Sequence, residues 1–168
     1  MLKALGIVGV IVVLAVIGYF AYGYFTTGQV NVYIHDPPGS GNQSPVKIYL
    51  TVASIMLHKE NATGNPWVTV SNRTITVLLS SNATFLASSR IPAGVYNEVR
   101  LVVVSGAVQI GNINVSATLP SQVLKIPIVG GMKLSGGSSV NLVIELPGVH
   151  YANGRITISP STQAYVQS

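Results

Sequence analysis

The chain has 168 residues, of which 48% are hydrophobic and only 8% are charged, and it contains no cysteine. A typical soluble domain carries roughly 25% charged residues, so the composition excludes an ordinary cytosolic protein, and the missing thiol excludes disulfides, thiolate zinc sites and cysteine nucleophiles. The formal net charge of +5 comes from Lys and Arg residues scattered singly along the chain. Nucleic-acid binding needs clustered cations, so we expect no nucleic-acid partner.

The N-terminal segment predicts a transmembrane helix. Residues 4–25 form an uncharged apolar run of 22 residues. A helix of that length is about 33 Å long, enough to cross a hydrocarbon core of roughly 30 Å. Lys3 precedes the run and aromatic residues end it, so the positive-inside rule places the N-terminus in the cytoplasm and the rest of the chain outside. The side chains expected to contact membrane lipid are Leu5, Ile11, Val13, Ile17, Tyr19 and Phe20.

Two other interpretations of this segment stay open. A secretory signal peptide has an apolar core of roughly 7–15 residues and a small-residue cleavage site, for which 21–23 could serve. The tripeptide Lys3-Ala4-Leu5 resembles the processing site of archaeal prepilins, whose apolar helix packs in a filament core. The length of the run favours a retained anchor over residues 1–27, followed by an extracytoplasmic domain over residues 28–168.

From residue 28 onward, apolar side chains recur at every second position, which is typical of half-buried strands. Between Val52 and Ile55 the apolar phase shifts, as a β-bulge requires. Residues 101–104 are apolar on both faces, which indicates a central strand. Strands are predicted over 30–35, 46–58, 67–70, 74–79, 95–105, 107–118, 123–129, 140–146 and 155–159.

Turn signals rich in Gly, Pro and Asn separate these segments, and the Gly/Ser-rich stretch 130–139 predicts a flexible hairpin connection. The spacing predicts an all-β fold behind the helix, a β-sandwich of roughly eight to ten mostly antiparallel strands.

Several stretches of the exterior segment match a known pattern. They are 28–37 (GQVNVYIHDP), 52–58 (VASIMLH), 67–70 (WVTV), 91–96 (IPAGVY), 99–101 (VRL) and 124–126 (LKI). Together they resemble the DUF4382 domain, a family of exported prokaryotic domains of unknown function that is well represented in archaea. The resemblance covers nearly the whole exterior segment and implies an exported β domain without naming an activity.

The exterior segment is rich in N-glycosylation sequons. In an exported chain each Asn-x-Ser/Thr is a potential glycan acceptor on a loop or strand end. Asn61 and Asn82 are the strongest candidates because loop-forming residues flank them, whereas Pro45 should impair the first sequon. The five acceptors are Asn42, Asn61, Asn72, Asn82 and Asn114.

Residues suited to metal binding or catalysis are sparse. The ligand-type residues lack zinc-motif or EF-hand spacing, and we expect structural roles for them, with Asp36 capping the turn at Pro37 and Pro38. No Gly-x-Ser-x-Gly elbow is present and only four carboxylates exist, so we assign no catalytic residue, metal or cofactor and expect no enzyme. The ligand-type residues considered are His35, Asp36, His58, Glu60 and His150.

Trp67 supports two interpretations. The favoured one is that it opens a strand and fills the core, and the other is that it belongs to a sugar-stacking surface. The leading functional expectation is a membrane-anchored, glycosylated cell-surface protein with a structural or interaction role in the envelope, or an accessory subunit of a membrane assembly. Its expected partners are membrane lipid, N-linked glycans, and other envelope proteins or further copies of the chain.

Two alternative functions remain. One is a filament or adhesion subunit that assembles through the apolar N-terminus or donates the strand 29–35 to a neighbour. Pairing of that strand inside its own sheet would count against strand donation. The other alternative is a carbohydrate-binding module, which requires exposed aromatic side chains such as Trp67.

Overall fold

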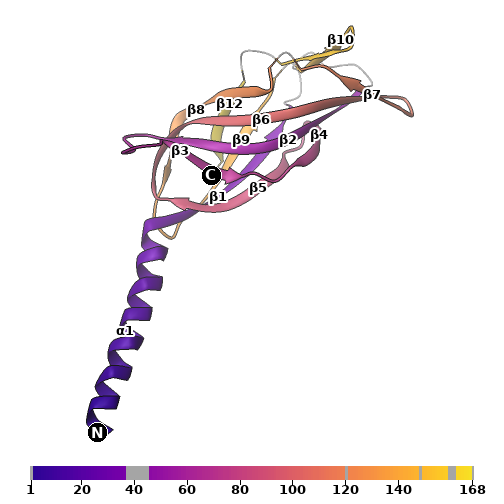
Figure 1. The fold of residues 1–168 in the computed structure, drawn as a ribbon. Coiled ribbons are helices and arrows are strands. Elements are labelled where there is room, and N and C mark those ends of the chain that lie inside the picture. Colours follow the sequence, from indigo (N-terminus) through magenta and orange to yellow (C-terminus); the bar gives the residue numbers. More distant parts are fainter. Residues whose placement is uncertain (1, 37–45, 120, 148, 159–161, 168) are drawn as a thin grey trace.

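A computed structural model shows one long helix joined to a domain of strands (Figure 1). The structure describes residues 2–36, 46–119, 121–147, 149–158 and 162–167. Helix α1 spans Leu2–Thr26 and β1 begins at the next residue, so no linker separates them. The helix projects away from the strands (Figure 1), and its part Val8–Thr26 is long and apolar enough to cross a membrane.

Twelve strands follow the helix in the described part of the chain. They are β1 (Thr27–His35), β2 (Val46–Lys59), β3 (Trp67–Ser71), β4 (Ile75–Leu79), β5 (Thr84–Pro92), β6 (Gly94–Ile110), β7 (Ile113–Ala117), β8 (Val123–Leu134), β9 (Ser139–Glu145), β10 (His150–Ala152), β11 (Arg155–Thr157) and β12 (Gln163–Gln167). The expected all-β fold behind one apolar helix is confirmed.

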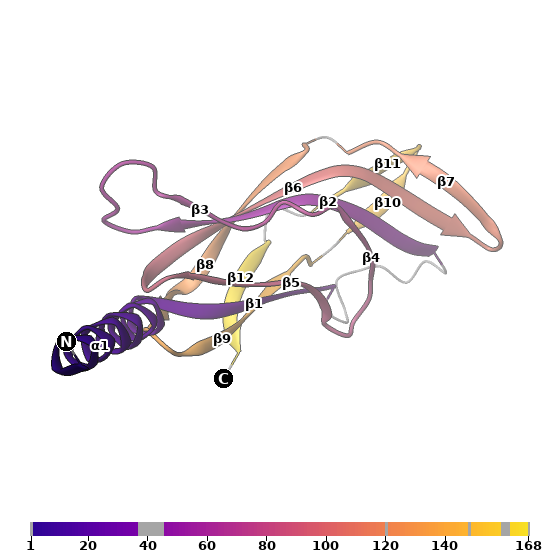
Figure 2. The ribbon, with the colours of Figure 1, turned by 60° about the horizontal axis from the view of Figure 1, so that its bottom comes forward.

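Ten of the strands form one continuous mixed sheet that folds back on itself. The order is β3-β2-β6-β8-β12-β9-β1-β5, with β4 also paired to β2 and β7 also paired to β6. Pairing is antiparallel except between β1 and β9 and between β8 and β12. β3 and β4 pack against β5, which makes the sheet nearly barrel-like. The small β10–β11 hairpin lies with β7 at the end of the domain away from the helix (Figures 1 and 2).

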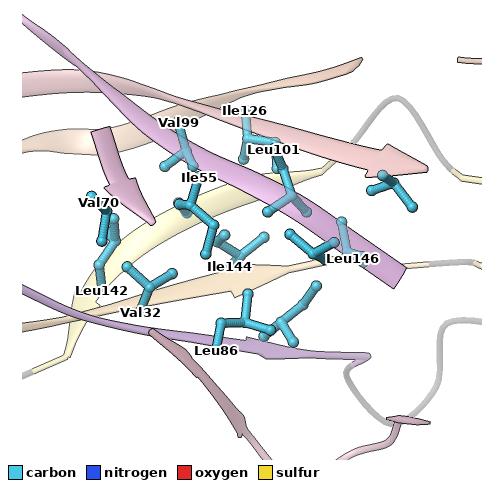
Figure 3. Close-up of a cluster of buried hydrophobic side chains, with 14 of the residues drawn as sticks. Val32, Ile55, Val70, Leu86, Val99, Leu101, Ile126, Leu142, Ile144 and Leu146 are labelled. Atoms are coloured by element: carbon cyan, nitrogen blue, oxygen red, sulfur yellow. The ribbon is translucent and has the colours of Figure 1, made fainter. Parts of the chain in front are cut away.

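Apolar side chains from the two halves of the sheet fill its interior (Figure 3). On β1 every second side chain is buried, including Val30, Val32 and Ile34. β6 pairs with β2 on one side and β8 on the other, so it is a central strand, as expected for 101–104. Only its inner face is covered, however, because Leu101 and Val103 are buried whereas Val104 is exposed. Burial of this apolar surface provides the main driving force for the fold.

The phase shift expected in 46–58 is also confirmed. The register of β2 against β6 shifts between Thr51 and Val52 and again before Ser54. An extra residue in one strand turns the following side chains to the opposite face. Leu57 therefore points into the core, whereas His58 belongs to the outer face.

The sequence-based strand assignment is wrong in several regions. Residues 95–110 form one strand, β6, rather than two, and β5, β10 and β12 were not predicted. The stretch 130–139 is not a hairpin, because β8 continues to Leu134, β9 begins at Ser139, and β12 lies between the two strands. The loop 135–138 between β8 and β9 is held by hydrogen bonds, which argues against the expected flexibility. The Ser138 hydroxyl donates to the Ser135 carbonyl at 2.7 Å and accepts from the Ser135 amide at 3.1 Å.

β1 lies inside the sheet. It pairs antiparallel with β5 and parallel with β9 along nearly its whole length. Because both of its edges are occupied, this pairing counts against donation of residues 29–35 to a neighbouring molecule.

Candidate functional site

The outer face of β3, β2, β6 and β8 carries a hollow of about 430 Å³, which we call the Trp67 hollow. Register explains how its residues meet. His58 on β2 lies opposite Trp67 on one side and Glu98 on the other, and directly opposed residues of an antiparallel pair share a face. The lining residues are His58, Trp67, Asn97, Glu98, Arg100, Lys125 and Pro127.

Trp67 is the centre of the contacts in this hollow. The Arg100 guanidinium carbon lies 3.8 Å from the centroid of the indole ring, a cation–π arrangement. The His58 ring contacts the indole edge-on, with centroids 5.0 Å apart. His58 Nδ1 and Asn97 Oδ1 are joined by a hydrogen bond of 2.9 Å. The hollow thus combines one aromatic surface with several polar groups.

The expectation that Trp67 fills the core is wrong. Trp67 does open β3, as expected, but its side chain is half-buried and absent from the core cluster. The reason is register: the bulged strand β2 presents His58 outward, and Trp67 pairs with that residue. The neighbouring Val70 points inward instead and is buried.

The charges of the Trp67 hollow are incompletely matched. Arg100 on β6 lies directly opposite Lys125 on β8, and like charges in directly opposed positions destabilise a sheet. Glu98 supplies the one carboxylate of the lining, so positive charge is in excess. In the part of the chain that the structure describes, Arg100 Nε is the one buried side-chain nitrogen or oxygen without a hydrogen-bond partner. A hollow lined by two opposed cations and a single carboxylate is suited to an anionic ligand.

A second cluster holds the end of α1 on the domain, and we call it the helix seat. It consists of Thr26 and Thr27 together with the turn 92–94 and the loop 135–138. The Ala93 amide donates to the Thr26 carbonyl at 2.8 Å, and the Gly137 amide donates to the Thr27 carbonyl at 2.9 Å. Both carbonyls at the end of the helix therefore have partners in the strand domain.

Side chains reinforce the helix seat. The Thr26 and Thr27 hydroxyls donate back to carbonyls of the last helical turn, at 2.8 Å and 2.7 Å. Arg90 donates to the Thr27 hydroxyl and carbonyl, both at 3.4 Å. The Arg90 guanidinium carbon also lies 5.5 Å from the ring centroid of Tyr24. The seat thus joins the helix to β5 and to the β8–β9 connection.

Glycines allow the close approach at the helix seat. A Cβ added to Gly136 would collide with the Phe25 carbonyl oxygen, and one added to Gly137 would lie 2.5 Å from the Tyr24 ring. Gly137 also has a φ of +71°, which side-chain-bearing residues rarely adopt. Gly136 and Gly137 therefore serve tight packing against the helix.

Tyr96 fixes the turn 92–94 from inside. Its side chain is fully buried, and its hydroxyl donates a 2.6 Å hydrogen bond to the Pro92 carbonyl. Burial raises the pKa of Tyr96 to about 12. The IPAGVY stretch thus positions Ala93 for its contact with the helix.

The described sequons are all accessible. Asn61 lies in the turn after β2 with a φ of +52°, Asn72 and Asn82 lie between strands, and Asn114 lies on β7. All four side chains are exposed. Asn42 lies outside the described residues, as do Pro37 and Pro38, whose turn Asp36 was expected to cap.

The ligand-type residues are spread over the domain. His35 at the end of β1 contacts Tyr165, with ring centroids 6.5 Å apart, whereas His150 lies on β10 at the distal end. Within the described ranges, no three His, Asp or Glu residues form a group that could hold a metal ion.

The side chains expected to contact lipid lie on α1. Ile11, Val13, Ile17, Tyr19 and Phe20 are exposed, and Leu5 belongs to the same helix.

These features define an all-β domain carried directly on an N-terminal apolar helix. The chain belongs to the DUF4382 family, described as a domain of unknown function, whose family model matches residues 27–160. The match begins at the first residue of β1 and leaves out the helix. The resemblance stated from the sequence is confirmed.

No curated protein matches the chain. Among solved structures, it is similar to a "putative cell adhesion protein" from Bacteroides eggerthii DSM 20697, with 11% identity, a TM-score of 0.40, and coverage of 84% of this chain and 54% of that one. A "putative cell adhesion protein" from Bacteroides ovatus ATCC 8483 gives 12% identity, a TM-score of 0.26, and coverage of 85% and 46%. The chain spans about half the length of these proteins, and likeness of this degree carries no functional assignment.

Proposed function

We propose that this protein is a single-pass, membrane-anchored surface protein. In this proposal α1 is retained in the membrane with its N-terminus in the cytoplasm, and the β domain works outside the cell by interacting with other molecules. The role is structural in the envelope or that of an accessory subunit in a membrane assembly. The observation that carries the proposal is an apolar helix whose described span Val8–Thr26 is not buried in the domain and passes into β1 without a linker.

The exposure of α1 supports a lipid environment. Large apolar side chains are exposed on all sides of the helix, for example Ile11 at 60% and Phe20 at 70%. Water solvates such a surface poorly, and contiguous apolar patches of this kind mark membrane or protein contacts. Aromatic rings gather at the end of α1 that joins the domain, and the Arg90 cation lies next to one of them, the ring of Tyr24. Aromatic rings followed by polar and charged groups are typical of the passage from a membrane to water.

The exposed sequons support an extracytoplasmic glycoprotein. Asn61, Asn72, Asn82 and Asn114 are all solvent-accessible, as attachment of a glycan requires. Intact-mass measurement and glycopeptide mapping of the native protein test this part of the proposal. Bare peptides at all of these positions would contradict it.

The anchor and its orientation are tested on the full chain in native membranes. We expect the protein to resist alkaline extraction, to need detergent for solubilisation, and to keep its N-terminal sequence. Protease added to intact cells should cleave the β domain and leave the N-terminus protected. A chain beginning near Leu5, recovered without detergent in large particles, would support a filament subunit. A soluble chain beginning after Gly23 would support a secreted protein.

A carbohydrate-binding role is a second candidate. It requires an aromatic side chain on the surface, and Trp67 lies on the outer face of the sheet rather than in the core. The charged and polar side chains that line the Trp67 hollow indicate which chemical class of saccharide it would bind.

A further inference from the structure

We propose that the Trp67 hollow binds a saccharide that bears a carboxylate, with Arg100 and Lys125 contacting the carboxylate and Trp67 contacting the sugar ring. The proposal adds a ligand to the surface role proposed above. Its test does not depend on membrane orientation, because binding is measured on the purified chain, so either proposal can fail alone.

The case for an anion comes from the two cations. Only nine of the 168 residues are Lys or Arg, yet Arg100 and Lys125 are placed directly opposite each other on neighbouring strands. Their repulsion costs stability unless an anion lies between them. Glu98 is on the same face two residues before Arg100, but it balances only one of the two charges.

The case for a carboxylate comes from the geometry of Arg100. Its guanidinium lies over the indole ring, which occupies one face of the planar group and leaves the N–H donors at its edge. Nε is buried without a partner in the described structure, so the two terminal nitrogens of the guanidinium are the donors left for a ligand. A planar fork of donors matches the two oxygens of a carboxylate.

The case for a saccharide comes from the rest of the lining. The volume of about 430 Å³ falls in the range of about 300–1,000 Å³ that small-molecule sites occupy. Trp67 gives an apolar surface for the C–H groups of a sugar ring, and Asn97 and His58 add groups that hydrogen-bond to hydroxyls. A peptide or a bare phosphate would make little use of this combination.

The chain contains a single tryptophan, so intrinsic fluorescence reports directly on the hollow. The experiment titrates the full chain in detergent micelles with trigalacturonate, with the neutral galactose trimer, with inorganic phosphate and with an acidic peptide. We expect saturable fluorescence change with trigalacturonate, at least about tenfold weaker binding of the other three probes, and weaker binding at higher salt.

Variants locate the site. Arg100→Gln and Lys125→Gln should each weaken trigalacturonate binding about tenfold or more, measured by calorimetry. Lys133→Gln is the matched control, since Lys133 is an exposed cation on the same strand that does not line the hollow, and it should leave the affinity unchanged. Lys125 is exposed, so its substitution tests the site even if Arg100→Gln impairs folding.

Three results would overturn the proposal. The first is no binding of trigalacturonate at millimolar concentration. The second is an equal loss of affinity in Lys133→Gln, which would indicate non-specific attraction. The third is equally tight binding of phosphate or of the acidic peptide, which would assign the hollow to a different ligand.

Discussion

The helix seat and the Trp67 hollow use similar residues in opposite ways. Each contains an arginine near an aromatic ring, Arg90 beside Tyr24 and Arg100 over Trp67. Arg90 also donates to Thr27 within the chain, whereas Arg100 keeps a buried Nε without a partner and faces another cation. An arginine whose donors bond to groups of its own chain indicates a structural role. An arginine with an unpartnered donor and an unbalanced charge indicates a role in binding another molecule. Substitutions at the two places should therefore separate stability from binding.

The largest effect is expected from Gly136→Ala at the helix seat. The added methyl collides with the Phe25 backbone, which cannot move without disturbing the junction. Overpacking of this kind costs about 3 kcal/mol of unfolding free energy, measurable by thermal unfolding of the full chain in detergent. Gly23→Ala is the control, because its methyl would meet open space. Equal stability of the two variants would show that the seat is not tightly packed.

The next effect concerns Tyr96, which supports the seat from the core. Its folded pKa of about 12 lies above the ordinary value of 10.0, so its stabilising contribution is present below pH 10 and is lost as the pH rises from 10 to 12. The loss should reach about 2 to 3 kcal/mol, at 1.36 kcal/mol per pKa unit. Chemical unfolding of wild type and Tyr96→Phe across this range measures it. A wild-type profile that runs parallel to that of Tyr96→Phe would contradict the prediction.

A smaller effect is expected from Arg90→Gln. The substitution removes the contact with the Tyr24 ring and weakens two long hydrogen bonds to Thr27. We expect a loss of about 1 kcal/mol in unfolding free energy and no change in trigalacturonate affinity. A loss of affinity with unchanged stability would reverse the roles that we assign to the two arginines.

The smallest effect should have the opposite sign. Lys125→Gln removes one of two directly opposed cations, so we expect unfolding free energy to rise by up to about 0.5 kcal/mol while ligand affinity falls. The comparison uses Lys133→Gln, for which stability should stay unchanged. Destabilisation by Lys125→Gln would show that Lys125 serves the fold rather than a ligand.

The sequence predicted those strands whose apolar residues alternate strongly. β1 shows this best, since its buried residues alternate along the whole strand. β5 was not predicted because it is an edge strand in which only Leu86 and Ile91 are buried. β12 was not predicted because its one buried side chain is the small Ala164. Binary alternation therefore identifies strands that are well covered by the core and misses those at its margin.

The candidate site was only partly predictable. Trp67 stood out as the single tryptophan, but the face it occupies depends on pairing with His58, which is set by a bulge in β2 and by contacts distant in sequence. The opposition of Arg100 and Lys125 depends on the β6–β8 register in the same way. The helix seat was missed because glycines that permit close packing look like glycines of a flexible loop until their neighbours are known.

The direct passage of α1 into β1 also determines how the protein would respond to mechanical force. A pull on α1 enters β1 along the strand axis, and β1 is held by ladders to β5 and β9 on its two edges. The hydrogen bonds of both ladders then share the load in shear, whereas an edge strand would be peeled off one bond at a time. A surface protein tethered in this way would withstand tension between the membrane and whatever its domain holds.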